Sequence, residues 1–174
     1  MMILLTGGSA CGKSSYAESI CLNAPLPRYY LAAMQPYGEE GRRKVERHRR
    51  LRAGKGFETI ERYTGYAELQ LPGRGTALLE CICNLTANEM FDEAGNQSDP
   101  VERVLAGVEA LAGQCELLVV VTNDVGSDGI CYEEGTTDYV RALGTINAAL
   151  AAKADTVVEL VAGIPILLKG ALPL

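Results

Sequence analysis

A glycine-rich segment near the amino terminus has the residue types and the spacing of a phosphate-binding loop. Its residues, in order, are Gly7, Gly8, Ser9, Ala10, Cys11, Gly12, Lys13 and Ser14. They satisfy the pattern G-x-x-x-x-G-K-[ST] in full, and a short apolar run precedes them. Gly7 and Gly12 permit backbone conformations that turn successive N–H groups inward as an anion-binding nest. We therefore predict that this loop binds the phosphates of a nucleoside triphosphate.

Two side chains at the end of the loop complete the expected phosphate site. Lys13 is placed to reach the β- and γ-phosphates, and the Ser14 hydroxyl is placed to ligate Mg²⁺. A magnesium ion also needs a carboxylate, which acts directly or through a water molecule. Glu80 ends an apolar run and is our choice for this carboxylate. Asp124, which follows the apolar run 117–122, is the alternative.

Residues 42–55 concentrate positive charge in an otherwise acidic chain. They hold eight of the sixteen lysines and arginines and one glutamate, so they carry +7, whereas the whole chain carries −6 and the remainder therefore −13. Such a segment is either an anion-binding surface or the solvated face of a basic helix. We do not expect nucleic-acid binding, because the net charge is negative and no recognised motif accompanies the segment.

The only histidine of the chain, His48, lies within this basic segment. On a helix its same-face neighbours four residues away are Lys44 and Arg52. Flanking cations disfavour protonation of the imidazole, which leaves the ring nucleophilic near neutral pH. The same cations would bind the phosphates of a nucleotide whose α-phosphorus the ring attacks, giving a covalent intermediate. The alternative interpretation is a solvated surface histidine.

The elements that must position these residues follow from the apolar pattern of the chain. Strands are expected over 2–6, 28–33, 57–61, 76–81, 117–122, 156–161 and 164–168. Helices are expected over 13–22, 39–53, 84–93, 100–111 and 137–153. Asp99 is the expected N-cap of the fourth helix. Continuous apolar strands that alternate with helices predict an α/β fold with a mostly parallel sheet, and the tight turn at Gly163 predicts an antiparallel hairpin at one edge.

Length and composition are those of one globular domain, residues 1–174. Apolar residues make up 48% of the chain and charged residues 22%. No run approaches the ~20 apolar residues of a membrane span, and the apolar opening is too short for a signal peptide. None of the six cysteines belongs to a Cys-x-x-Cys pair, and a strand would point Cys81 and Cys83 the same way. We expect a cytoplasmic protein whose thiols are small buried side chains.

Taken together, these segments resemble the bifunctional adenosylcobinamide kinase and adenosylcobinamide-phosphate guanylyltransferase family of cobalamin biosynthesis. The resemblance runs almost from end to end. The matching segments begin with the apolar opening and the phosphate loop, residues 2–14, and continue with Val45-Glu46-Arg47-His48, Arg52, Phe57-Glu58-Thr59-Ile60-Glu61, Leu78-Leu79-Glu80-Cys81, Asn88, Val121-Thr122-Asn123-Asp124-Val125-Gly126, Gly144 and Asn147. The segment around His48 and the Thr-Asn-Asp-Val-Gly segment are far more specific than the phosphate loop.

The resemblance implies a P-loop domain with a RecA-like sheet that performs two reactions. First, adenosylcobinamide takes a γ-phosphate from ATP or GTP. Second, GMP passes from GTP to the product, adenosylcobinamide phosphate, through a GMP-histidine intermediate. It also implies Mg²⁺ as cofactor and a homo-oligomer, a trimer or larger.

The resemblance also implies a set of site residues. His48 matches the guanylylated histidine of the family. Glu61 and Glu80 match acids at its nucleotide site. The remaining matches are a phosphate-contacting stretch, Arg49, Arg50, Leu51 and Arg52, and a guanosine-contacting stretch, Ala32, Ala33 and Met34.

This chain departs from the family pattern near its carboxyl terminus. Ser127-Asp128 adds a residue, Cys131-Tyr132 replaces Val-Pro, and Tyr139-Val140-Arg141 stands where the family has Phe-Arg-Asp. Two alternatives therefore stay open beside the bifunctional enzyme. One is a P-loop small-molecule kinase that lacks the guanylyltransferase step. The other is a nucleotide-binding regulatory protein with degenerate catalysis.

Overall fold

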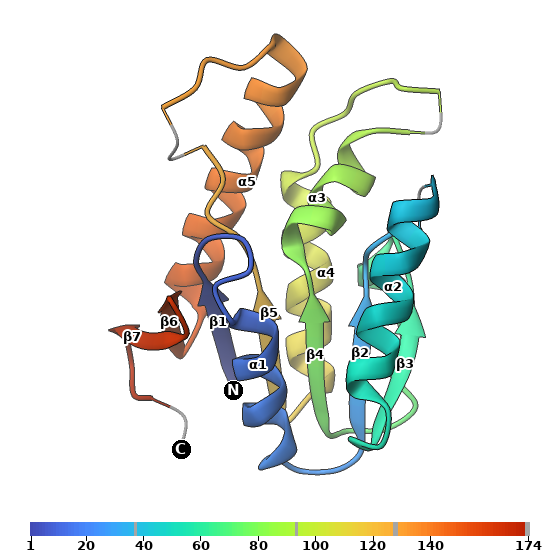
Figure 1. Ribbon diagram of the computed structural model, residues 1–174, viewed down its shortest axis with the longest axis vertical. Coiled ribbons are helices and arrows are strands. Elements are labelled where there is room, and N and C mark those ends of the chain that lie inside the picture. Colours follow the sequence, from blue (N-terminus) through green and yellow to red (C-terminus); the bar gives the residue numbers. More distant parts are fainter. Residues whose placement is uncertain (37, 93, 127–128, 173–174) are drawn as a thin grey trace.

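One sheet organises the part of the chain that the structure describes (Figure 1). The structure is a computed structural model that describes residues 1–36, 38–92, 94–126 and 129–172, with every side chain except those of residues 40, 44, 48 and 51. The strands are β1 (Met2–Thr6), β2 (Arg28–Ala32), β3 (Phe57–Glu61), β4 (Thr76–Glu80), β5 (Leu117–Val121), β6 (Thr156–Val161) and β7 (Ile164–Lys169). Their order in the sheet is β3-β2-β4-β5-β1-β6-β7.

All neighbouring strands pair in parallel except β6 and β7, which pair antiparallel at one edge. The central strands are continuous apolar runs because helices cover them on both faces. Every residue of β5 is buried, whereas β7 is largely exposed. The expected α/β class, with a mostly parallel sheet and an antiparallel terminal hairpin, is confirmed.

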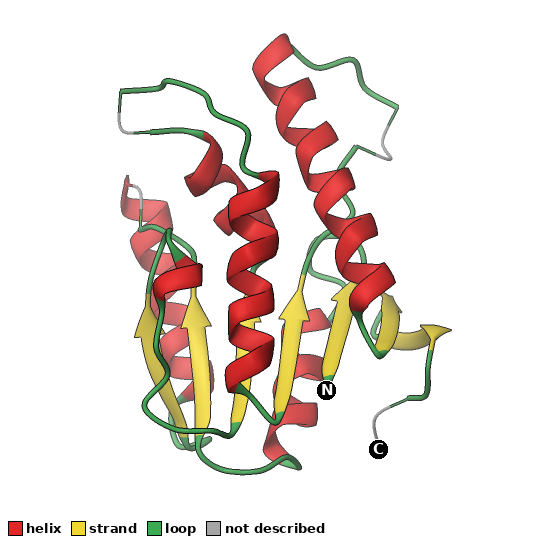
Figure 2. Ribbon diagram, turned by 180° about the vertical axis from the view of Figure 1, so that it is seen from behind, coloured by secondary structure: helices red, strands yellow, loops and turns green. Residues whose placement is uncertain are grey.

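The helices lie on both faces of this sheet (Figures 1 and 2). They are α1 (Lys13–Leu22), α2 (Gly38–Arg52), α3 (Ile82–Met90), α4 (Val101–Gln114) and α5 (Glu134–Lys153), with a short 3₁₀ helix, η1 (Tyr66–Glu68). Figure 1 shows α1 and α2 in front of the sheet, and Figure 2 shows α4, α5 and η1 on the other face. None of the described helices combines the length and the apolar content needed to cross a bilayer.

Helix boundaries differ from the expected ones by a few residues, and η1 was not predicted. Helix α3 begins at Ile82, directly after the strand, rather than at Asn84, and α5 begins at Glu134 rather than at Thr137. Helix α4 continues three residues beyond Leu111 to Gln114, whose side chain bonds to the backbone of Leu69 and Leu71. The prediction of Asp99 as N-cap was wrong by one residue, because α4 begins at Val101 and Pro100 is its N-cap. The Asp99 carboxylate still accepts a hydrogen bond from the N–H of Val101 at 3.0 Å.

Candidate nucleotide site

The carboxyl ends of four parallel strands bring the expected site residues to one edge of the sheet. Ala32 of β2 pairs with Glu61 of β3 on one side and with Glu80 of β4 on the other. Glu80 in turn pairs with Val121 of β5. The phosphate loop follows β1 at the same edge. Because ligands of such sheets bind beyond the carboxyl ends of the strands, this edge is where a nucleotide site is expected.

The phosphate loop is held in shape by its glycines and by the turn between β6 and β7. Gly7 has a φ of 134°, and a Cβ added there would lie 2.4 Å from the carbonyl oxygen of Leu160. Gly12 has a φ of 101°, and a Cβ there would lie 3.3 Å from the Cα of Gly163. The N–H of Gly163 donates to the carbonyl of Cys11 at 2.9 Å. Positive φ angles at Gly7 and Gly12 agree with the predicted use of these glycines.

Lys13 is folded over this loop. Its side chain is buried, with a residue exposure of only 6%, and Nζ donates to the carbonyl oxygens of Gly7 at 2.9 Å and Gly8 at 2.6 Å. An ammonium that bonds to loop carbonyls lies directly beside the space that phosphates occupy in sites of this kind. The loop therefore holds its cation by its own carbonyl oxygens, and the binding of phosphates there stays a prediction.

Ser14 and Glu80 lie next to each other at the start of α1 and the end of β4. The Ser14 hydroxyl donates to Oε1 of Glu80, and the hydroxyl of Tyr30 donates to Oε2 at 2.8 Å. Burial raises the pKa of Tyr30, and the nearby charge of Glu80 raises it further, so this phenol stays protonated and acts as the donor. Glu80 is thus fixed by one contact at each of its two oxygens.

The oxygen atoms of Ser14 and Glu80 fit a magnesium ion. Mg²⁺ prefers hard oxygen ligands and is held by one or two carboxylates together with substrate phosphates and water. Across the described residues there is no group of three or more His, Cys, Asp or Glu side chains arranged as a metal site. Asp124, the alternative acid, does not line the cavity described below, and its backbone N–H donates to the carbonyl of Gly7. These observations favour Glu80 as the acid.

A cavity of about 950 Å³ connects the phosphate loop with α2 and with the ends of β2 to β5. Most of the expected site residues line it: Ser9, Ala10, Cys11, Gly12, Lys13, Ser14, Ala32, Met34, Arg49, Arg52, Glu61 and Glu80. Gly7, Gly8, Ala33 and Arg50 do not line it. The side chains of His48 and Leu51 lie outside the description, so the structure places only their backbone, in α2.

The basic helix α2 presents its arginines in different ways. Arg50 is exposed and pairs with Glu46 one turn earlier, whereas Arg49 reaches across to Glu61 of β3. Arg52, at the end of the helix, is only 7% exposed, and its Cζ lies 3.4 Å from the centre of the Tyr30 ring. One helix therefore carries both solvated arginines and a buried arginine that lines the cavity.

Several residues that line the cavity were not among the predicted site residues. They are Ser15, Tyr30, Pro36, Arg42, Val45, Glu46, Arg47, Tyr63, Cys81, Cys83, Asn84, Val121 and Asn123. One signal could have found Tyr30: it stands two residues before Ala32 on the same strand and therefore faces the same side of the sheet. Asn84 and Asn123 follow β4 and β5 and could have been found as polar residues beyond strand ends.

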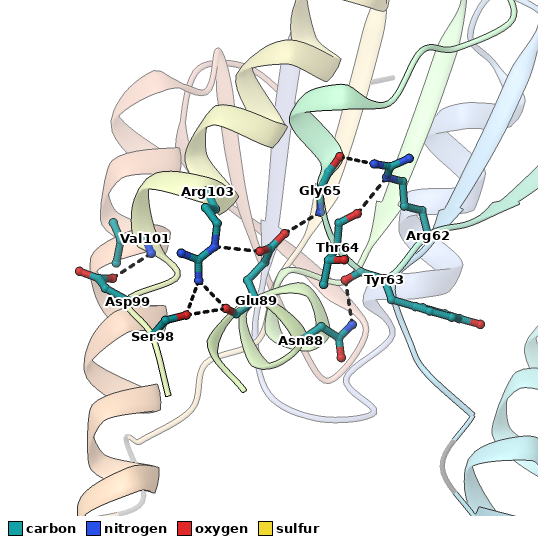
Figure 3. Close-up of polar contacts among 10 residues, drawn as sticks. All are labelled: Arg62, Tyr63, Thr64, Gly65, Asn88, Glu89, Ser98, Asp99, Val101 and Arg103. Atoms are coloured by element: carbon teal, nitrogen blue, oxygen red, sulfur yellow. Dashed lines mark hydrogen bonds and ion pairs between the residues drawn. The ribbon is translucent and has the colours of Figure 1, made fainter. Parts of the chain in front are cut away.

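A polar network braces the loops that follow β2 and β3, and Figure 3 shows its contacts with the loop after β3. The side-chain amide of Asn88 donates to the carbonyl of Ala33 at 2.8 Å and to that of Tyr63 at 3.0 Å. Next to it, Glu89 accepts from the N–H of Gly65 at 2.7 Å and from Arg103 at 3.0 Å. These contacts hold two cavity-lining loops against α3.

The cysteines match the expectation of buried thiols only in part. Four of them are buried, Cys11 is intermediate and Cys131 is exposed. Cys81 and Cys83 do not share a strand, because β4 ends at Glu80 and Cys83 lies in α3. A hydrogen bond from Cys81 lowers the pKa of Cys83 against the opposing effect of burial, and the Asn123 amide also donates to it, at 3.4 Å.

Comparison with known proteins identifies the family. The sequence model of the cobinamide kinase / cobinamide phosphate guanyltransferase family matches residues 3–168. The chain belongs to this family. The bifunctional adenosylcobalamin biosynthesis protein CobU of Escherichia coli strain K12 is 32% identical over 185 residues, which cover 97% of this chain and 100% of that protein. CobU of Salmonella typhimurium gives the same identity and coverage, and CobP of Pseudomonas aeruginosa is 26% identical over 98% of both chains.

Two solved structures match this chain more weakly than these family members do. An ATPase from the type III secretion system of pathogenic bacteria is 15% identical, with a TM-score of 0.47 over 91% of this chain and 50% of its own. The P4 protein of bacteriophage phi6, solved in complex with ADP, is 11% identical, with a TM-score of 0.45 over 99% of this chain and 58% of its own.

Proposed function

We propose that this chain phosphorylates adenosylcobinamide with ATP or GTP and then transfers GMP from GTP to the product, giving adenosylcobinamide-GDP in cobalamin biosynthesis. Membership of the cobinamide kinase / cobinamide phosphate guanyltransferase family supports both activities. The single observation that carries the proposal for this chain is one cavity lined both by the phosphate loop with Glu80 and by the cationic helix α2.

In the kinase step, the acceptor hydroxyl attacks the γ-phosphorus. The bond from this phosphorus to the β–γ bridging oxygen breaks, a nucleoside diphosphate leaves and the hydroxyl loses its proton. Positioning and charge neutralisation supply most of the catalysis in such a displacement. Lys13 and the loop N–H groups bind the phosphates, while Ser14 and Glu80 would hold magnesium, Glu80 through water. Bound magnesium supplies charge that offsets the β- and γ-phosphates.

In the guanylyl step, an imidazole nitrogen of His48 attacks the α-phosphorus of GTP. A phosphorus–nitrogen bond forms and pyrophosphate leaves. A phosphate oxygen of adenosylcobinamide phosphate then attacks the same phosphorus, and the phosphorus–nitrogen bond breaks to free the histidine. Arg47, Arg49 and Arg52, all of which line the cavity, bind the phosphates during both displacements.

The setting of these reactions is also part of the proposal. We place the enzyme in the cytoplasm, where nucleoside triphosphates are supplied, and we expect a trimer or larger homo-oligomer, as family resemblance implies. Sedimentation of the purified protein tests the assembly, and a monomer at micromolar concentration would contradict it.

The direct test supplies adenosylcobinamide, GTP and Mg²⁺ and identifies the products by mass. We expect the GDP adduct. A product that stops at the phosphate would instead favour the small-molecule kinase, and GTP binding without any product would favour the regulatory protein.

A second test addresses His48. With α-labelled GTP, the wild-type protein should acquire an acid-labile label, and His48→Ala should lose it while keeping kinase turnover. Arg43→Ala is the matched control, because Arg43 lies on the same helix, is 77% exposed, pairs along the helix with Glu39 and is not among the described residues that line the cavity. Absence of label on the wild-type protein would overturn the proposed intermediate.

A further inference from the structure

Tyr30 is the one cavity-lining side chain that joins the magnesium side of the site to the basic helix within the described residues. It lies on β2 and is only 3% exposed. Its hydroxyl donates to Oε2 of Glu80 at 2.8 Å, and the other oxygen of that carboxylate accepts from Ser14. Tyr30 therefore takes part in fixing how the carboxylate is presented to the phosphate loop.

The ring of Tyr30 makes a second, different contact. The guanidinium carbon of Arg52 lies 3.4 Å from the ring centre, within the range of a cation–π interaction. Phe57 contacts the same ring edge-on, with centroids 6.3 Å apart and planes at 85°, which keeps the ring from turning. A single side chain thus holds an acid through its hydroxyl and a cation through its face.

Arg52 has the features of a cation that awaits an anion. It is more than nine-tenths buried and lines the cavity, and its Nε has no hydrogen-bond partner among the described residues. Burying a guanidinium N–H without a partner is costly, and a phosphate oxygen is the acceptor that this geometry suits. The aromatic face offsets part of the charge but accepts no conventional hydrogen bond.

We infer that Tyr30 is a positioning residue that keeps Glu80 and Arg52 in register, so that both act on one bound nucleotide. The inference rests on the proposed nucleotide site and does not depend on the identity of the acceptor. Tyr30 touches neither reacting atom; it acts through the carboxylate on one side and the guanidinium on the other. Its two contacts are chemically different, so they can be removed separately.

Two variants of Tyr30 separate its two contacts, and a third variant is the control. Tyr30→Phe removes only the hydroxyl and its bond to Glu80, and keeps the ring beneath Arg52. Tyr30→Leu removes both contacts. Tyr29→Phe is the matched control, because Tyr29 is the neighbouring buried tyrosine of β2, is 1% exposed and does not line the cavity. Thermal unfolding of all three checks that each variant is folded.

The measurements are GTP dissociation constants by calorimetry, with Mg²⁺ and with EDTA, and the kcat and KM of the kinase step. For Tyr30→Phe we expect the gain in GTP affinity on adding Mg²⁺ to fall roughly tenfold, the size of one hydrogen bond to a charged group, while affinity in EDTA stays within about twofold of wild type. kcat should fall with little change in the KM for the acceptor. Tyr30→Leu should in addition weaken binding in EDTA by roughly threefold or more, because the cation–π contact is lost.

Two results would overturn the inference. One is a Tyr30→Phe protein that keeps the full magnesium-dependent gain. The other is a further loss when Tyr30→Phe is added to Glu80→Gln, because a residue that acts through Glu80 has nothing left to position there. If the variants behave as expected but wild-type protein forms no GDP adduct, the proposed function fails and the positioning by Tyr30 stands.

Discussion

The two halves of the cavity are built in opposite ways. The phosphate loop is shaped mainly by its backbone: Gly7 and Gly12 have positive φ angles, and the loop packs on the β6–β7 turn. The one cationic side chain of this loop, Lys13, is buried. Helix α2 instead contributes charged side chains that extend into solvent: those of Arg43 and Arg50 are 77% and 76% exposed. It joins the rest of the site at its end, where Arg52 packs on Tyr30.

Because of this difference, we expect substitutions in the two halves to have different effects on stability and nucleotide affinity. At Gly7 the loop packs so closely on the backbone of Leu160 that it has no room for an added atom, so one methyl group there is enough to disrupt it. An exposed cationic helix loses affinity in small steps, and salt weakens its contribution because solvent screens it.

The largest effect is expected for Gly7→Ala. The new Cβ would lie 2.4 Å from a backbone oxygen at a φ of 134°, so clash and strain add. We expect a loss of about 2–4 kcal/mol in the free energy of unfolding, with a melting temperature lower by roughly 10 °C, and loss of GTP binding. Thermal and urea unfolding and calorimetry measure these quantities.

Gly54→Ala is the control for this change. Gly54 follows α2, also has a positive φ, of 80°, and a Cβ there meets nothing within 4 Å. It should cost about 1 kcal/mol and leave GTP affinity unchanged. If the two alanine variants are equally stable and bind GTP equally well, the close backbone packing at Gly7 does not determine the shape of the phosphate loop.

A smaller effect is expected when the brace of Figure 3 is removed. Asn88→Ala leaves the carbonyls of Ala33 and Tyr63 without their amide donor, which should lower the free energy of unfolding by about 1–2 kcal/mol. Because the braced loops line the cavity, the KM for GTP should rise as well. Asn96→Ala is the control, since Asn96 is exposed and its side chain bonds to the exposed Asp92 within the loop that follows α3. Equal stability of the two variants would show that the loops hold without Asn88.

The arginines of α2 test the other half of the comparison. Arg52→Ala should weaken GTP binding roughly tenfold, because it removes a buried cation that lines the cavity. Arg50→Ala should change affinity by less than about twofold, because an exposed pair such as Arg50 with Glu46 contributes little and is screened. Calorimetry at two salt concentrations measures both variants. Similar losses for the two would mean that α2 acts only through its overall charge.

The regular features of the fold could be predicted from the sequence, because each of them has a local sequence pattern. Continuous apolar runs located the strands to within a residue, and glycines at fixed spacing predicted the positive φ angles at Gly7 and Gly12. The contact of Ser14 with Glu80 could be anticipated because both stand at known ends of strand and helix.

The missed features depend on packing between distant segments. Tyr30, Arg52 and Glu80 meet only because of the register of β2 on β4 and the place where α2 ends, and no local pattern encodes either. The same holds for Asn88, whose partners lie 55 and 25 residues away. The predicted role of His48 rests on the sequence alone, since its side chain is outside the description.

The smallest expected effect concerns Cys21, which is buried near the carboxyl end of α1, the helix that follows the phosphate loop. Burial raises the pKa of this thiol from an ordinary value near 9.0 to about 12; the charge of Arg28 lowers it and that of Glu18 raises it. The folded protein therefore keeps a proton that the unfolded chain releases above pH 9. The contribution of Cys21 to stability is full below pH 9 and is lost as the pH rises toward 12.

Urea unfolding at pH 8 and pH 9.7 measures this loss. Wild-type protein should lose about 1 kcal/mol more between the two conditions than Cys21→Ala, which has no thiol to titrate. Cys131→Ser should lose as much as wild type, because Cys131 is exposed. If Cys21→Ala shows the same pH dependence as wild type, the alkaline sensitivity comes from other groups and not from the buried Cys21 thiol.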